Sequence, residues 1–175
     1  VKNGVALEGE AQARMREINK ELSSLEFTFG NNLLAENNAF ADKFGLSISE
    51  YAGAMAVTED RARREEMFKA YASRGNNGNE NDTKEIITKI MALRIEKAKL
   101  LGYETPAAFI LSDKMAQTPE TVDTFLADLM APAVIKAKGE IADMQLMMDE
   151  DVKAGVLPEG SKIEAWDWAY YAEKV

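Results

Sequence analysis

The apolar positions between Ala11 and Phe29 recur at the spacing of one face of an α-helix. The apolar residues are spaced four, three, four, three and four positions apart, with charged residues between them. They are Ala11, Met15, Ile18, Leu22, Leu25 and Phe29. This stripe is shorter than the roughly three heptads that identify a coiled coil, so core packing is the favoured interpretation and a coiled-coil seam the alternative. Gly30 and four nearby asparagines weaken the later turns, and we expect the helix to end near Phe40.

Residues 42–57 carry two glycines and two serines and show no steady apolar period, which is typical of a linker or a short irregular segment. Thr58 is predicted to be the N-cap of a helix that ends near Ser73, before Gly75. The segment 74–83 is rich in glycine and asparagine and is predicted to form an exposed, mobile loop. Asp82 followed by Glu85 resembles a capping box.

The second half of the chain continues the helical pattern. A helix that ends at Gly102 is predicted next, and one of its faces comprises Ile86, Ile90, Leu93, Lys97 and Leu101. The pairs Thr105-Pro106 and Thr118-Pro119 each predict a helix start, because the hydroxyl can cap and proline suits the first helical position. The second of these helices is long, is expected to kink at Pro132, and is expected to close before Gly155 and Pro158.

The last element, 166–175, is short and aromatic, so we expect it to dock on the others. No stretch predicts a strand and no repeat recurs at a fixed period. The predicted fold class is therefore all-α, an irregular array of helices without a sheet. We expect a single helical fragment over 1–175, divided into a first long helix (1–40), a linker (41–57) and a helical block (58–175).

Composition places the chain among ordinary globular proteins. Of its 175 residues, 46% are apolar and 29% charged, and no apolar run approaches the roughly 20 residues that a membrane-spanning helix needs. The net charge of −9 disfavours nucleic acid and anionic membrane surfaces as partners. Cysteine is absent, which excludes disulfides and a thiol nucleophile and leaves the compartment, cytoplasmic or periplasmic, open.

Histidine is also absent, and this is the most informative count in the sequence. Without imidazole the chain lacks a His-based zinc site, a Ser-His or Cys-His pair, and a general base that titrates near neutrality, unless a buried carboxylate is tuned upward. The chain begins without methionine or a secretory signal and stops inside a helix-like run without a capping glycine, so we expect it to be an excerpt of a longer protein.

Four local groups have both a functional and a structural interpretation. Gly75 and Gly78 do not follow a strand and precede no Gly-Lys-Ser/Thr, so a connection is favoured over a phosphate cradle. The acidic group Asp149, Glu150, Asp151 and Glu159 lacks the spacing of a calcium loop and is expected to be a solvated face. Core filling is favoured over a methionine-rich binding groove for Met144, Met147 and Met148.

The densest aromatic group comprises Trp166, Trp168, Tyr170 and Tyr171, with Asp167 among them. A packed helix start, capped by Asp167, is favoured over a peptide-binding wall.

Four consecutive blocks of the sequence resemble bacterial peptidyl-dipeptidases of the thimet-oligopeptidase family. The blocks are RARREEMFKAYASRG (61–75), NDTKEIITKIMALRIEKAKLLGY (81–103), MAQTPETVDTFL (115–126) and WDWAYYAEKV (166–175). The resemblance implies a nearly all-helical zinc metallopeptidase whose two lobes enclose a channel for short peptides, and which releases C-terminal dipeptides or acts as an oligopeptide endopeptidase. Relatives commonly carry a longer connection before Thr58 than this chain does.

The family's zinc site is a helix with HExxH and a later glutamate, which would follow downstream of WDWAYYAEKV. The resemblance therefore assigns no catalytic, cofactor-binding or metal-binding residue to 1–175, and implies zinc only in the parent enzyme. We expect this piece to form channel wall or scaffold, to be inactive alone, and to have the rest of the polypeptide and short peptides as partners.

Exposed apolar faces are also expected, through which the piece could dimerise. One alternative is a free-standing helical interaction module. Another is an acid-base enzyme that pairs Asp167 with a remote glutamate, which no spacing supports.

Overall fold

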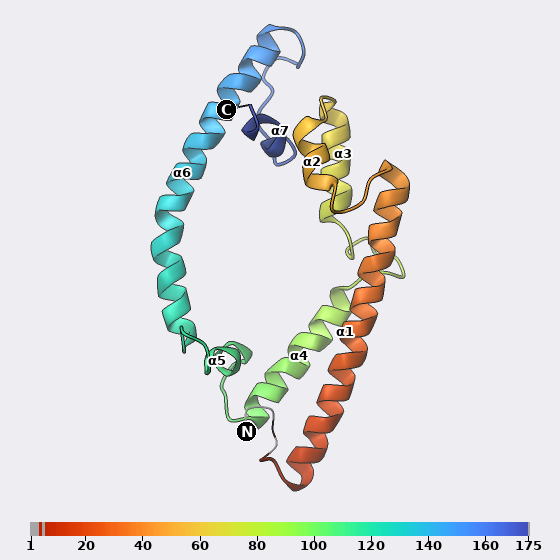
Figure 1. Ribbon diagram of the computed structural model, residues 1–175, viewed down its shortest axis with the longest axis vertical. Coiled ribbons are helices and arrows are strands. Elements are labelled where there is room, and N and C mark those ends of the chain that lie inside the picture. Colours follow the sequence, from red (N-terminus) through yellow and green to blue (C-terminus); the bar gives the residue numbers. More distant parts are fainter. Residues whose placement is uncertain (1–3, 5, 175) are drawn as a thin grey trace. The chain divides into compact units, whose positions relative to one another are not determined.

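The computed structural model describes residues 4 and 6–174, and over these residues it contains seven helices and no strand (Figure 1). The all-α prediction is therefore confirmed. In chain order the helices are α1 (Gly9–Phe44), α2 (Tyr51–Val57), α3 (Arg61–Ala72), α4 (Lys84–Leu100), α5 (Pro106–Leu111), α6 (Pro119–Lys153) and α7 (Trp168–Ala172). No helix in the described part of the chain combines the length and the apolar character needed to cross a membrane.

The chain divides into two compact units, and each unit is built from two separate stretches of sequence. The first unit takes residues up to 35 together with 75–128, and the second takes 36–74 together with those from 129 onward. The two longest helices, α1 and α6, each contribute one part to either unit. This division interleaves the chain. The expected single fragment, with a first helix, a linker and a helical block, stays a prediction.

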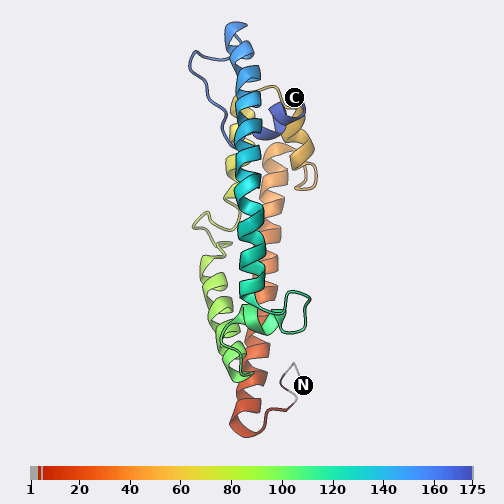
Figure 2. The ribbon, with the colours of Figure 1, turned by 90° about the vertical axis from the view of Figure 1, so that its left-hand side faces the viewer.

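The core of the first unit lies between the first part of α1 and α4, which run side by side (Figures 1 and 2). Ile18 and Leu22 of α1 are buried against Ile90 and Leu93 of α4. Leu25, Ile86 and Leu100 pack around them. The apolar stripe predicted from the sequence therefore fills a core between two helices.

Polar side chains extend the contact between these two helices on either side of the core. Arg14 donates to Glu96 over 2.7 Å, and Arg94 donates to Glu26 over 3.0 Å. Lys97 also donates to Asn19 over 2.7 Å. All three pairs are at least partly exposed, so they set the alignment of the helices more than they add to stability.

The second unit contains two apolar clusters. Phe40 and Phe44, at the end of α1, are buried with Met55 of α2 and Met67 of α3. Trp166 and Ala169 pack on this cluster, and α2, α3 and α7 lie together (Figure 1). The other cluster joins Met144 and Met148 of α6 to Tyr171 of α7, with Leu157, Ile163, Met147 and Tyr170 around it.

Residues 41–57, which we expected to be a linker, contain both the last turn of α1 and the whole of α2. The first helix continues past Phe40 because Phe40 and Phe44 are both needed in the apolar cluster of the second unit. Helix α2 has the sequence YAGAMAV, and its seven residues are too few to show the apolar periodicity of a helix. It is held by tertiary packing of the buried Met55 rather than by local preference.

The Thr-Pro helix starts are confirmed, since the hydroxyls of Thr105 and Thr118 accept hydrogen bonds from the backbone nitrogens of Ala108 and Thr121. The predicted cap of α3 is wrong. Asp60 occupies that position and accepts from the backbone nitrogens of Ala62 and Arg63, whereas the hydroxyl of Thr58 donates to the carbonyl of Ala54 at the end of α2. Thr58 therefore terminates one helix while Asp60 begins the next.

The predicted capping box at α4 is also wrong. Thr83 is the N-cap residue, but its hydroxyl donates to the carbonyl oxygen of Gly75 over 3.0 Å instead of capping the helix. Asp82 accepts from the ammonium group and the backbone nitrogen of Lys84 and from the backbone nitrogen of Gly78, and these bonds lower the pKa of Asp82 to about 2. The two ends of the loop 74–83 are joined by the hydrogen bonds from Thr83 to the carbonyl oxygen of Gly75.

Helix α6 continues through Pro132 as one element and ends at Lys153, before Gly155. Its kink at Pro132 stays a prediction. The last helix is shorter than the predicted 166–175, and Val175 lies outside the described residues.

Candidate functional site

Two arginines from α3 converge on one carboxylate that precedes α7. Arg64 donates to Asp167 Oδ1 over 2.8 Å, and Arg61 donates to Asp167 Oδ2 over 2.8 Å. The Asp167 side chain is fully buried and that of Arg64 nearly so, while Arg61 is about three-quarters buried. Removed from water, each of these charges depends on the others for its stabilisation.

The remaining donors of the two arginines hold the chain segments around the carboxylate. Arg64 donates to the carbonyl oxygens of Thr58 and Glu59, and Arg61 donates to that of Lys162. The backbone nitrogen of Glu164 donates to Asp167 as well. We call Arg61, Arg64 and Asp167 the arginine–aspartate cluster, and it fixes the segment before α7 against the start of α3.

Burial by itself would raise the pKa of Asp167, but the hydrogen bonds from Arg61, Arg64 and the Glu164 backbone outweigh it and leave that pKa below its ordinary value. The pKa of Arg61 is raised in turn, chiefly by its hydrogen bond to Asp167. Asp167 therefore stays ionised at neutral pH and acts as a fixed negative charge. This arrangement is the opposite of what a general acid would need.

Aromatic rings surround the cluster. The guanidinium of Arg64 lies 4.1 Å from the centre of the Tyr170 ring, and the ammonium of Lys174 lies 3.6 Å from the same ring. Trp166 packs against Phe68 of α3 with ring centres 6.2 Å apart. Within the described residues, nothing accepts a hydrogen bond from the buried Nε of Arg64 or Nε1 of Trp166.

This region corrects the sequence prediction for Asp167. Asp167 precedes α7, but its side chain makes no capping bond and is committed to the arginines. Sequence analysis missed Arg61 and Arg64 as its partners. A signal was present, because Arg61, Arg64 and Met67 are spaced three residues apart and share the buried face of α3.

Two of the acidic residues considered for calcium binding are engaged in contacts within the second unit. Asp151 accepts from the hydroxyl of Tyr171 over 2.7 Å, and Asp149 accepts from the side-chain amide of Gln145. Burial is the main cause that raises the pKa of Tyr171 above its ordinary value, and the hydrogen bond to Asp151 is the second. The expected solvated face thus describes the exposed Glu150 and Glu159 but not Asp149 or Asp151.

The other two sequence candidates have structural roles. Met144 and Met148 are buried and Met147 packs beside them, which confirms core filling. In the glycine-rich loop, the backbone nitrogen of Gly78 donates to Asp82, and Gly75 adopts φ +71° against Thr83. These contacts account for both glycines without a phosphate.

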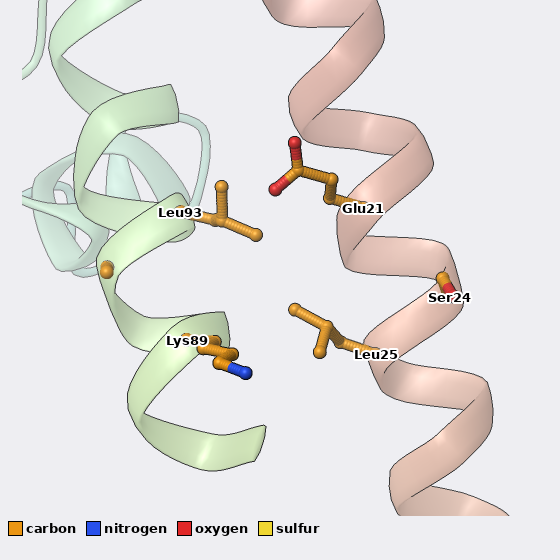
Figure 3. Close-up of a pocket in the computed structure, with 6 residues that line it drawn as sticks. Glu21, Ser24, Leu25, Lys89 and Leu93 are labelled. Atoms are coloured by element: carbon orange, nitrogen blue, oxygen red, sulfur yellow. The ribbon is translucent and has the colours of Figure 1, made fainter. Parts of the chain in front are cut away.

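The first unit carries grooves along α1 and α4. One groove, of about 400 Å³, is lined by Glu21, Ser24 and Leu25 of α1 and by Lys89, Ala92 and Leu93 of α4 (Figure 3). In Figure 3, Leu25 and Leu93 project between the two helices, and Glu21 and Lys89 stand beside them. The groove is therefore apolar, with one carboxylate and one ammonium group at its edges.

A larger groove, of about 630 Å³, lies where α5 approaches α1 and α4, and we call it the α4–α5 groove. Its apolar lining includes Met91, Phe109, Ile110 and Val122, while Glu26, Arg94 and Lys97 supply its charges. Mostly apolar walls with a few polar groups are the usual composition of sites that bind small molecules or peptide side chains. The groove holds no Ser-His, Cys-His or carboxylate pair that could perform hydrolysis.

The residues of this chain do not fit a zinc centre. The sequence contains neither histidine nor cysteine, and no group of three or more carboxylates in the described part of the chain is arranged to hold a metal ion. Structural and catalytic zinc sites draw their ligands mostly from imidazole and thiolate groups.

Comparison with known proteins defines the class to which this helical chain belongs. Residues 54–175 match peptidase family M3. The chain is 30% identical to the dipeptidyl carboxypeptidase of Escherichia coli K12 over 204 residues, which cover 98% of this chain and 29% of that relative. It is 32% identical to the oligopeptidase A of the same organism, with 98% of this chain and 30% of the relative covered.

A plant protein, the probable cytosolic oligopeptidase A of Arabidopsis thaliana, is 28% identical over all of this chain and 30% of its own length. The chain therefore belongs to peptidase family M3, as its four sequence blocks indicated. It spans less than a third of the length of these relatives. Each alignment is also longer than the 175-residue chain, so the relatives carry positions that this chain lacks.

Proposed function

We propose that this chain is the non-catalytic helical part of a zinc metallopeptidase that hydrolyses short peptides. The named relatives include a dipeptidyl carboxypeptidase and oligopeptidases, so the parent enzyme would release C-terminal dipeptides or cleave within oligopeptides. The observation that carries the proposal is the match of residues 54–175 to peptidase family M3 in a chain with no histidine or cysteine.

In this proposal the zinc and its ligands belong to the rest of the parent polypeptide, where the metal would activate a water molecule for attack on the peptide bond. The part described here supplies channel wall and scaffold. The α4–α5 groove supports the wall role, because its apolar lining suits the side chains of an extended peptide. The arginine–aspartate cluster supports the scaffold role, because the Asp167 carboxylate is buried and ionised and both of its oxygens accept hydrogen bonds from within the protein.

A photoreactive peptide tests the wall role in the parent enzyme. A short blocked peptide carrying a benzophenone group would be irradiated with the parent polypeptide, and the labelled fragments mapped by mass spectrometry. Labelling within α1, α4 or α5, suppressed by excess unmodified peptide, is expected. Labelling confined to residues outside 1–175 would contradict the wall role.

The hydrolytic function of the parent is tested on the same preparation. Cleavage of a blocked peptide should be abolished by a chelator and restored by zinc. A parent polypeptide that binds partner helices but shows no chelator-sensitive cleavage would instead support the interaction-module alternative.

A further inference from the structure

One apolar stripe runs along the part of α6 that belongs to the second unit. Its members, Met130, Val134, Ala137, Ile141, Met144 and Met148, follow one another at steps of four, three, four, three and four residues, which places them on one face of the helix. The stripe changes character along its length. Met144 and Met148 are buried, whereas Met130, Val134 and Ile141 are 60%, 40% and 41% exposed.

The buried end of the stripe shows what kind of partner covers it. Met144 and Met148 pack against Tyr171, Leu157 and Ile163, which all come from the chain segment that follows α6. The exposed end offers the same surface chemistry over the preceding turns. A row of exposed large apolar side chains on one helix face is unfavourable in water and marks an interaction surface.

We propose that the exposed stripe of α6, from Met130 to Ile141, is the docking surface for a further segment of the same peptidase polypeptide outside residues 1–175. This inference rests on the proposed function, because it takes the chain to be part of a longer peptidase. Two observations select this occupant. The stripe is continuous with a contact already made by the same polypeptide, and the relatives are more than three times as long as the matched part.

The helix itself provides a matched control. Ile135 is adjacent to Val134, is apolar and is 74% exposed, but it lies on a different face of α6 from the stripe. A general effect of apolar exposure would involve both residues, whereas a docked segment would contact Val134 and leave Ile135 free.

The test places the photoreactive amino acid p-benzoylphenylalanine at Met130, Val134 or Ile135 of the parent polypeptide. Irradiation at Met130 and Val134 should yield cross-linked peptides from the same polypeptide outside 1–175, with at least a tenfold lower yield at Ile135. Mixing isotope-labelled and unlabelled protein distinguishes cross-links within one chain from those between copies. Cross-links confined to 1–175, cross-links between copies, or equal yields at Val134 and Ile135 would overturn the proposal.

A second measurement uses stability. Val134→Asp should lower the thermal midpoint of the parent by several degrees more than Ile135→Asp, and equal shifts would count against docking. Peptide hydrolysis is measured on the same preparation. Cross-links without chelator-sensitive hydrolysis would contradict the peptidase function but support the docking surface. Hydrolysis without the cross-links would support the peptidase function and contradict the docking surface.

Discussion

Arg64 and Asp167 lie 103 positions apart in the sequence, yet a hydrogen bond of 2.8 Å joins Arg64 Nη2 to Asp167 Oδ1. Both side chains are almost completely buried. The bond connects the first turn of α3 to the residue before α7. Arg61, the first residue of α3, donates to the other oxygen of the same carboxylate. A buried pair of this kind is costly to break, because removing one partner leaves the other charged and unsolvated.

Asp167→Asn is therefore expected to destabilise the fold by about 3–5 kcal/mol, since Arg64 would lose its buried counter-charge. The free energy of unfolding in urea measures this effect. Arg14→Ala is the matched control, because it breaks the half-exposed pair with Glu96 and should cost at most about 1 kcal/mol. Equal losses in the two variants would show that the arginine–aspartate cluster does not hold the second unit together.

The contribution of the Asp167 carboxylate to stability should also depend on pH. The pKa of Asp167 lies lower in the folded chain than its ordinary value of 3.8, so folding favours the ionised form. Its contribution to stability is complete above pH 3.8 and is lost as the pH falls through the lower, folded-state value. The difference in unfolding free energy between wild type and Asp167→Asn should accordingly stay constant from pH 7 to about 4 and shrink only at lower pH. Subtracting the variant removes the parallel effects of Glu50, Asp82 and Glu96, whose pKa values are also lowered.

The methionines provide a test of core packing. Met148 is buried against Tyr171, so Met148→Ala should cost about 2–5 kcal/mol through lost apolar burial and the cavity that remains. Met115 is fully exposed, and Met115→Ala should change the unfolding free energy by less than about 0.5 kcal/mol. A small effect at Met148 would indicate that the cluster around Tyr171 is loosely packed.

Two glycines should respond to alanine in opposite directions. Gly75 has φ +71°, and an added Cβ would lie 2.7 Å from Thr83 Oγ1, so Gly75→Ala should destabilise by roughly 1–2 kcal/mol or more. Gly30 lies inside α1 with open space around it, so Gly30→Ala should stabilise by about 0.5–1 kcal/mol. Thermal unfolding of the two variants beside wild type checks both signs. A neutral Gly75→Ala would contradict the close approach of the loop to Thr83.

The features that were predictable from sequence are those whose cause is local. The stripe through Ile18 and Leu22 repeats over enough turns to define a buried face, and the Thr105-Pro106 and Thr118-Pro119 starts carry both the capping hydroxyl and the proline. Helix α2 escaped prediction because its seven residues are held by Met55 in a cluster assembled from distant segments.

The contacts of the candidate site were predictable only in part. Asp167 was recognised within an aromatic group. Its partners, Arg61 and Arg64, belong to α3 and lie about a hundred positions earlier in the sequence. No periodicity links such distant residues, and an aspartate before a helix is more often a cap. Thr58 and Asp60 illustrate the same limit at short range, since both residue types cap helices and only the position of α2 decides between them.

The most direct test compares zinc content and peptide hydrolysis for the isolated 1–175 chain and for the parent polypeptide. We expect about one zinc ion per parent chain, with cleavage of a blocked peptide that a chelator abolishes, and neither property in residues 1–175. Chelator-sensitive cleavage by the purified 1–175 chain would contradict this expectation.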